Sequence, residues 1–166
     1  MDNYMKLEIA AKSVNEGFVR SAVAAFALPL SPSLSELSDI KTAVSEAVTN
    51  AIVHAYHGAN EQDKIEIECQ IFQTEEVGVL HIKITDYGCG IEDVEQALKP
   101  FYTTLAGDER SGMGFTIMQT FSDGFSVISE KGKGTCVTLT KRIGCDKLCQ
   151  EEECSQKALE RERVNA

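Results

Sequence analysis

Two polar side chains in one predicted helix have the types and the spacing of a catalytic pair. The apolar residues between positions 44 and 55 recur at three- and four-residue steps, which predicts a helix with one buried face. Glu46 and Asn50 fall one turn apart on its polar face, so the carboxylate and the carboxamide are neighbours. Together they offer a general base and a neutral oxygen ligand for a hard cation. Taken alone, the same pattern also describes an ordinary solvated helix face.

Two glycine-rich segments further along the chain indicate a ligand site. Asp86 ends a predicted strand, and Gly88 and Gly90 after it let the backbone turn tightly and approach a ligand, although a simple turn would look similar. Residues 110–115, Arg-Ser-Gly-Met-Gly-Phe, directly precede a predicted helix. Glycines that open a helix expose N–H groups at the positive end of its dipole, which suits a phosphate, and Arg110 adds a cation.

The elements that position these residues are strands and helices of a single domain. Ser13 with Glu16 and Ser33 with Glu36 form capping boxes that predict the starts of two long helices, the second running to about residue 56. A shorter helix is expected at 94–98, another follows Gly114, and segment 101–111 is interpreted as a functional loop, such as a lid. The apolar stripe of the first helix is predicted to contain Val14, Phe18, Ala22, Ala25 and Phe26.

The strand pattern sets the fold class. Strands are predicted over 6–10, 65–71, 80–84, 125–129 and 135–141. Their apolar and polar residues alternate, so one face of the sheet should be packed and the other wet. We therefore expect an α+β fold, a two-layer sandwich with a mostly antiparallel mixed sheet and helices on one face.

Length, charge and cysteine content limit the function classes. The 166 residues suit one domain, placed at 1–144, with a charged, cysteine-containing tail at 145–166. The net charge of -10 argues against non-specific nucleic-acid binding. No window approaches a membrane span, and residues 1–8 contain no apolar run, so we expect no signal peptide and a cytoplasmic protein. The six cysteines should then be free thiols, and the spacing of those in the tail fits a zinc site poorly.

Four motifs occur in an order and at separations that resemble a known superfamily. They are Glu46-x-x-x-Asn50, Asp86-x-Gly88-x-Gly90, Gly112-Met113-Gly114-Phe115 and Gly134-Thr135. The set resembles the ATP-binding boxes of the gyrase, Hsp90, histidine kinase and MutL superfamily, whose ATP site is the Bergerat fold. More closely, segments 41–54 and 109–118 resemble the anti-sigma F factor family of endospore-forming bacteria, which are serine kinases. The resemblance covers about residues 4 to 143.

This resemblance implies a role for each matching residue. Asp86 would accept a hydrogen bond from the adenine amino group with Thr135 beside it, and Asn50 would ligate Mg²⁺. Glu46 would be the catalytic base that takes the proton from the attacking hydroxyl. Arg20 on the first helix matches a partner-contact position. The remaining nucleotide-binding residues implied are Gly88, Gly90, Thr104, Arg110, Gly112, Met113, Gly114 and Phe115, of which Arg110 would meet the terminal phosphate.

The resemblance also implies a regulatory cycle. A homodimer with ATP and Mg²⁺ would hold sporulation sigma factor F, until an anti-anti-sigma factor displaces the sigma factor, is phosphorylated on serine and leaves. The chain has no residues left for the further domain of gyrase, chaperone or repair members, and His54, His57 and His81 do not suit a phosphoacceptor. Two alternatives stay open: a general-stress anti-sigma kinase, and a nucleotide-gated sigma-binding module without kinase activity, which would not need Glu46.

Overall fold

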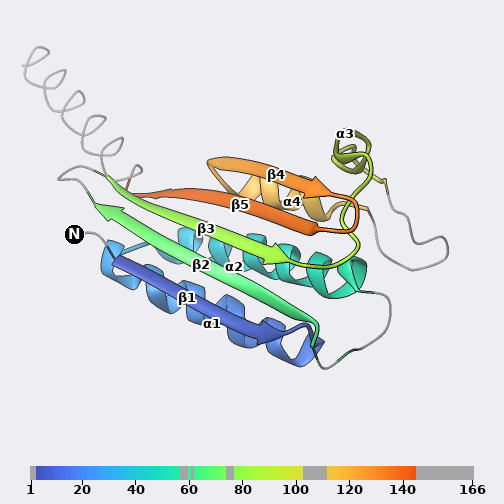
Figure 1. Ribbon diagram of the computed structural model, residues 1–166. Coiled ribbons are helices and arrows are strands. Elements are labelled where there is room, and N and C mark those ends of the chain that lie inside the picture. The colour runs from blue at the N-terminus through green and yellow to red at the C-terminus, as the bar shows by residue number, and fades with distance from the viewer. Residues whose placement is uncertain (1–2, 57–59, 61, 74–76, 103–111, 145–166) are drawn as a thin grey trace, which may run out of the picture.

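A five-stranded sheet forms one layer of the molecule (Figure 1). The computed structural model describes residues 3–56, 60, 62–73, 77–102 and 112–144. The sheet order is β1-β2-β3-β5-β4, and all four neighbouring pairs are antiparallel, where the sequence predicted a mostly antiparallel sheet. The strands are β1 (Asn3–Ala10), β2 (Lys64–Gln73), β3 (Gly78–Asp86), β4 (Gly124–Glu130) and β5 (Gly134–Ile143).

Three helices form the second layer, so the predicted α+β two-layer sandwich is confirmed. Helices α1 (Glu16–Ala27), α2 (Leu34–Asn50) and α4 (Gly114–Phe121) lie side by side against the sheet, with α2 in the middle (Figure 1). A one-turn helix, α3 (Val94–Ala97), lies beyond the sheet near β4. The core consists of the inward-facing strand residues and the apolar faces of the helices. Alternate strand residues such as Ile65 and Ile67 are fully buried, as the period-two pattern predicted.

Helix α2 begins where the sequence predicted. The Ser33 hydroxyl accepts a hydrogen bond from the Glu36 N–H at 3.2 Å, and the Ser33 N–H donates to Glu36 Oε2 at 2.6 Å, which completes the capping box. Its far end differs from the prediction. The α-helix stops at Asn50, and a turn of π-helix, Ala51–Ala55, replaces the last α-helical turn.

Helix α1 is rotated relative to the prediction. Most of the predicted apolar stripe is wrong, because Val14 is 82% and Phe18 58% exposed, while Val19 and Val23 are fully buried. Of the predicted residues, Phe26 does pack against the core. The helix has two apolar stripes about one residue apart, roughly 100° around its axis, and the one with smaller side chains packs against α2. The predicted Ser13 capping box is also absent, since residues 13–15 form a separate 3₁₀ turn after β1.

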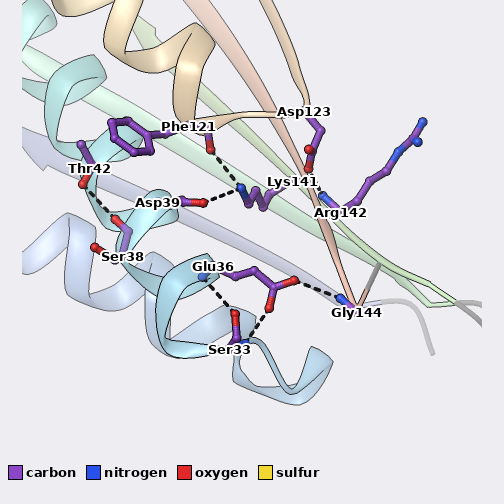
Figure 2. A network of polar contacts seen from close by, with 10 residues as sticks. All are labelled: Ser33, Glu36, Ser38, Asp39, Thr42, Phe121, Asp123, Lys141, Arg142 and Gly144. Atoms are coloured by element: carbon purple, nitrogen blue, oxygen red, sulfur yellow. Dashed lines mark hydrogen bonds and ion pairs between the residues drawn. The ribbon is translucent and has the colours of Figure 1, made fainter. Parts of the chain in front are cut away.

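Polar contacts tie α2 to the ends of β5 and α4 (Figure 2). Glu36 Oε1 accepts a hydrogen bond from the Gly144 N–H at 3.1 Å. Lys141 Nζ pairs with Asp39 Oδ2 at 2.8 Å and donates to the Phe121 carbonyl at 3.3 Å. The last residue of α4 is therefore fixed to α2 through a lysine on β5, while the first residue of α4 faces the opposite end of the sheet.

The expectations of free cysteines and of no membrane span can be compared with the structure only for the described residues. Cys69, Cys89 and Cys136 are free thiols, as expected, whereas the other three cysteines and the whole predicted tail lie outside the described residues. Within the part of the chain that the structure describes, no helix is both long enough and apolar enough to cross a bilayer.

Candidate nucleotide site

A cavity of about 980 Å³ opens where the C-terminal end of α2, the N-terminal end of α4 and the ends of β3 and β5 meet. Its volume falls within the range of small-molecule sites. The predicted site residues that line it are Glu46, Asn50, Asp86, Gly90, Gly112, Met113, Gly114, Phe115 and Thr135. Thr104 and Arg110 lie outside the described residues. The structure therefore brings together residues that are up to 89 positions apart, from Glu46 to Thr135.

At one end of the cavity, the first residue of α4 lies against the polar pair of α2. A Cβ atom on Gly114 would stand 2.9 Å from Asn50 Nδ2 and 3.3 Å from Glu46 Oε2, so a larger residue would displace both side chains. Gly112 has a φ of +64°, a left-handed conformation that favours glycine. Backbone N–H groups at this helix start carry partial positive charge beside a carboxylate and a carboxamide. This end suits a phosphate, a divalent cation and a hydroxyl group to be deprotonated.

At the other end, a buried carboxylate lies at the end of β3. Asp86 is only 5% exposed, and its Oδ1 accepts hydrogen bonds from the Gly88 N–H at 3.0 Å and the Thr135 N–H at 3.1 Å. Burial raises the pKa of Asp86 above its ordinary value, although these two hydrogen bonds act in the opposite direction. Oδ2 has no donor among the described residues. Asp86 is therefore held in place through one oxygen and presents the other to a ligand that donates hydrogen bonds.

The turn after Asp86 is clamped between two other segments. A Cβ atom on Gly88 would lie 2.0 Å from the Ala55 carbonyl oxygen, and one on Gly90 would lie 2.1 Å from the Glu130 carbonyl oxygen. Between them, the Cys89 N–H donates to the Ala55 carbonyl at 2.7 Å, and its thiol donates to the His54 carbonyl at 3.1 Å. Gly88 thus acts by close packing behind the cavity and is absent from its lining.

The remaining singled-out residues lie elsewhere or have structural contacts. Arg20 is on α1, outside the cavity, with its guanidinium 3.6 Å from Glu16 Oε1 and its side chain 47% exposed. His54 lines the cavity, His57 lies outside the described residues, and His81 sits on the outer face of the sheet. There the His81 ring shares a hydrogen bond with the Thr140 hydroxyl.

Sequence reasoning missed several polar residues at the site. Those that line the cavity are Thr49, Glu92, Asp93, Gln96, Tyr102 and Lys131. A further missed residue, which lies behind the lining, is Ser129 on β4. Its hydroxyl contacts Ile91, Gly134 and Thr135 behind the Asp86 end of the cavity. Only the strand alternation carries a signal for it, because that pattern places Ser129 on the same face as Val127.

Comparison with known proteins agrees with the motifs and the geometry. Residues 9–141 match the histidine kinase-like ATPase domain family. The chain is 51% identical over 143 residues to the anti-sigma F factor of Clostridium perfringens (strain SM101 / Type A), which covers 86% of this chain and 99% of the relative. It is 52% identical over 142 residues to the anti-sigma F factor of Clostridium botulinum (strain Eklund 17B / Type B), covering 86% and 96% respectively.

A solved structure supports the fold alone. The structure of the RsbU and RsbW domains of Rv1364c from Mycobacterium tuberculosis superposes with a TM-score of 0.58 at 18% identity, covering 85% of this chain and 32% of that one. Identity of about one half over nearly the whole length of the curated relatives decides the family. The chain belongs to the anti-sigma F factor family and carries a histidine kinase-like ATPase domain.

Proposed function

We propose that this protein is a cytoplasmic anti-sigma factor and serine protein kinase of sporulation. It binds sigma factor F and uses ATP and Mg²⁺ to phosphorylate an anti-anti-sigma factor on serine. The observation that carries the proposal is the close approach of Gly114 to Glu46 and Asn50, which puts a helix start, a carboxylate and a carboxamide at one end of the cavity. The names of the relatives, anti-sigma F factor, support the sigma-binding part.

The two ends of the cavity bind different parts of the nucleotide. Asp86 and Thr135 hold the adenine, and the N–H groups of residues 112–115 hold the phosphates at the start of α4. The side chain of Asn50 supplies an oxygen ligand to Mg²⁺, which would neutralise phosphate charge. Arg110, which lies outside the described residues, stays a prediction for the terminal phosphate.

Glu46 carries the proton transfer. Its carboxylate accepts the proton of the substrate serine hydroxyl while the serine oxygen bonds to the terminal phosphorus and the bond from that phosphorus to ADP breaks. A positioned carboxylate of this kind contributes about 10²- to 10⁴-fold to the rate. The remaining acceleration comes from positioning and charge neutralisation.

The protein partners would bind away from the cavity. Arg20 is half-exposed on α1. Phe18 on the same helix is exposed, as are Val14 and Leu28 in the 3₁₀ turns before and after it, an apolar group of a kind that marks protein interfaces. We propose that Arg20 contacts the protein partners and that the protein is a homodimer. In a pull-down with purified sigma factor, Arg20→Ala should fail to capture the sigma factor. The affinity of this variant for ATP should be unchanged.

The deciding experiment is transfer of labelled phosphate from ATP and Mg²⁺ to a purified anti-anti-sigma protein. Glu46→Gln should lose transfer but still bind ATP, whereas Asp86→Ala should lose ATP binding itself. The matched control is Glu8→Gln, which removes a carboxylate from an exposed ion pair with Lys64 on the outer strands and should transfer normally. Retained transfer in Glu46→Gln would remove Glu46 as the base.

Two other outcomes would favour the alternatives. ATP binding and sigma capture without any transfer would indicate a nucleotide-gated sigma-binding module. Transfer to a general-stress antagonist rather than to the sporulation antagonist would indicate a general-stress anti-sigma kinase.

A further inference from the structure

The Ser129 hydroxyl is the meeting point of three segments behind the Asp86 end of the cavity. Its Oγ lies 2.7 Å from the Ile91 nitrogen, 2.9 Å from the Gly134 carbonyl oxygen and 2.9 Å from Thr135 Oγ1. Ile91 and Thr135 line the cavity, whereas Ser129 is not among the lining residues. Ser129 therefore lies behind the cavity and contacts Thr135, a residue that lines it.

The direction of these hydrogen bonds follows from the number of hydrogens. Ser129 has one hydroxyl hydrogen, and the Gly134 carbonyl can only accept, so that hydrogen goes to Gly134. The Ile91 N–H supplies its own hydrogen to Ser129 Oγ. The contact between the two hydroxyls is then a hydrogen bond only if Thr135 donates to Ser129. This is the only assignment that makes all three contacts hydrogen bonds at once.

The assignment fixes what Thr135 offers to a ligand. With its single hydrogen directed at Ser129, the Thr135 hydroxyl has only lone pairs left for the cavity. The neighbouring Asp86 Oδ1 is occupied by two N–H groups, and its Oδ2 also accepts. This end of the cavity thus presents two acceptors and no hydroxyl donor from Thr135.

We propose that Ser129 is a positioning residue that makes the site select a purine with an amino group over one with a carbonyl group at the same ring position. It does so by holding the Thr135 hydroxyl as an acceptor. An amino group has two hydrogens to donate and so matches the two acceptors, Asp86 Oδ2 and Thr135 Oγ1. A carbonyl oxygen in its place would face a lone pair on each of these oxygens and could form no hydrogen bond with either. The inference rests on the proposed binding of ATP in this cavity, and adds a determinant of its base specificity.

The test compares the affinities for ATP and for inosine triphosphate, which has the carbonyl, by isothermal titration calorimetry. Wild type should prefer ATP. In Ser129→Ala the Thr135 hydroxyl is free to rotate and donate to the carbonyl, so the affinity ratio should narrow about two- to tenfold, the range of one net hydrogen bond. Ser129→Thr, which keeps the hydroxyl, should show the wild-type ratio of the two affinities. Ser126→Ala, the same change at an exposed position on β4, should leave it as in wild type.

A double-variant cycle separates this role from a merely structural one. Thr135→Val should itself narrow the ratio, and adding Ser129→Ala to it should change the ratio no further, because Ser129 acts through Thr135. If Ser129→Ala does not fold by circular dichroism, Ser129→Cys, a weaker donor, should narrow the ratio in the same direction. An unchanged ratio in folded Ser129→Ala or Ser129→Cys overturns the inference. Absence of ATP binding by wild type would instead overturn the proposed function.

Discussion

Replacing Gly114 with alanine tests whether the contact between α4 and the polar pair of α2 is functional. The added Cβ would stand 2.9 Å from Asn50 Nδ2, and ordinary Cβ contacts begin at about 3.4 Å, so the amide must withdraw by about 0.5 Å. Glu46, at 3.3 Å, must move by about 0.1 Å. Misplacement of catalytic groups by about 1 Å costs on the order of 10²-fold in rate. We expect phosphate transfer to fall roughly ten- to hundredfold.

The stability of Gly114→Ala should not fall together with its activity. Alanine is a better helix former than glycine by up to about 1 kcal/mol, so the melting temperature of Gly114→Ala should be unchanged or slightly raised. Gly17→Ala is the matched control, since Gly17 lies in α1 and a Cβ there meets nothing within 4 Å. It should gain stability and keep full transfer. Wild-type transfer by a folded Gly114→Ala protein, measured with labelled ATP, would refute the assignment of this contact to the phosphate end.

Three further predictions concern charged groups. Because burial raises the pKa of Asp86, Asp86→Asn should raise the melting temperature of the ligand-free protein and abolish its increase with ATP, measured by scanning fluorimetry. Burial alone would raise the pKa of Glu36, but hydrogen bonds from Ser33 and Gly144 outweigh it and lower the pKa below its ordinary value. The ionised Glu36 side chain therefore stabilises the fold above its unfolded pKa, and this stabilisation disappears as the pH falls through its folded pKa. The difference in unfolding free energy between wild type and Glu36→Gln, measured by urea unfolding, should be largest at about pH 7 and vanish in acid. A difference that does not change with pH would contradict this. Lys141→Met should cost about 1–3 kcal/mol in the same assay, because Asp39 is left charged and largely buried, and adding Asp39→Asn should recover part of the loss.

The sequence predicts those parts of the fold that depend on local pattern. The alternation through Ile65 and Ile67 fixes the inner face of β2, and the reciprocal bonds of Ser33 and Glu36 need only three residues to form. The buried face of α1 could not be predicted in the same way. That helix carries two competing apolar stripes, and only packing against α2 decides between them.

The same distinction between local patterns and long-range packing applies to the candidate site. The glycine motifs around Asp86 and Gly114 are local, so they are visible in the sequence, and the structure places both at the cavity. The position of Ser129 depends on the register of β4 against β5, in which it pairs with Thr135, and on the distant turn at Ile91. No local pattern predicts a hydroxyl whose partners come from the start of β5 and from a turn 38 residues earlier in the chain.

The π-helical turn at Ala51–Ala55 is a second feature that only the assembled fold explains. A regular α-helix was predicted there from the apolar spacing, but the carbonyls at its end have no later helical N–H to accept. In the structure, the His54 and Ala55 carbonyls accept from the thiol and the N–H of Cys89, which lies in the turn after Asp86. The helix that carries Asn50 is therefore bonded directly to the loop that follows Asp86. These two bonds give the carbonyls at the end of the π turn the partners that a helix end lacks, and π-helical turns of this kind occur frequently at functional sites.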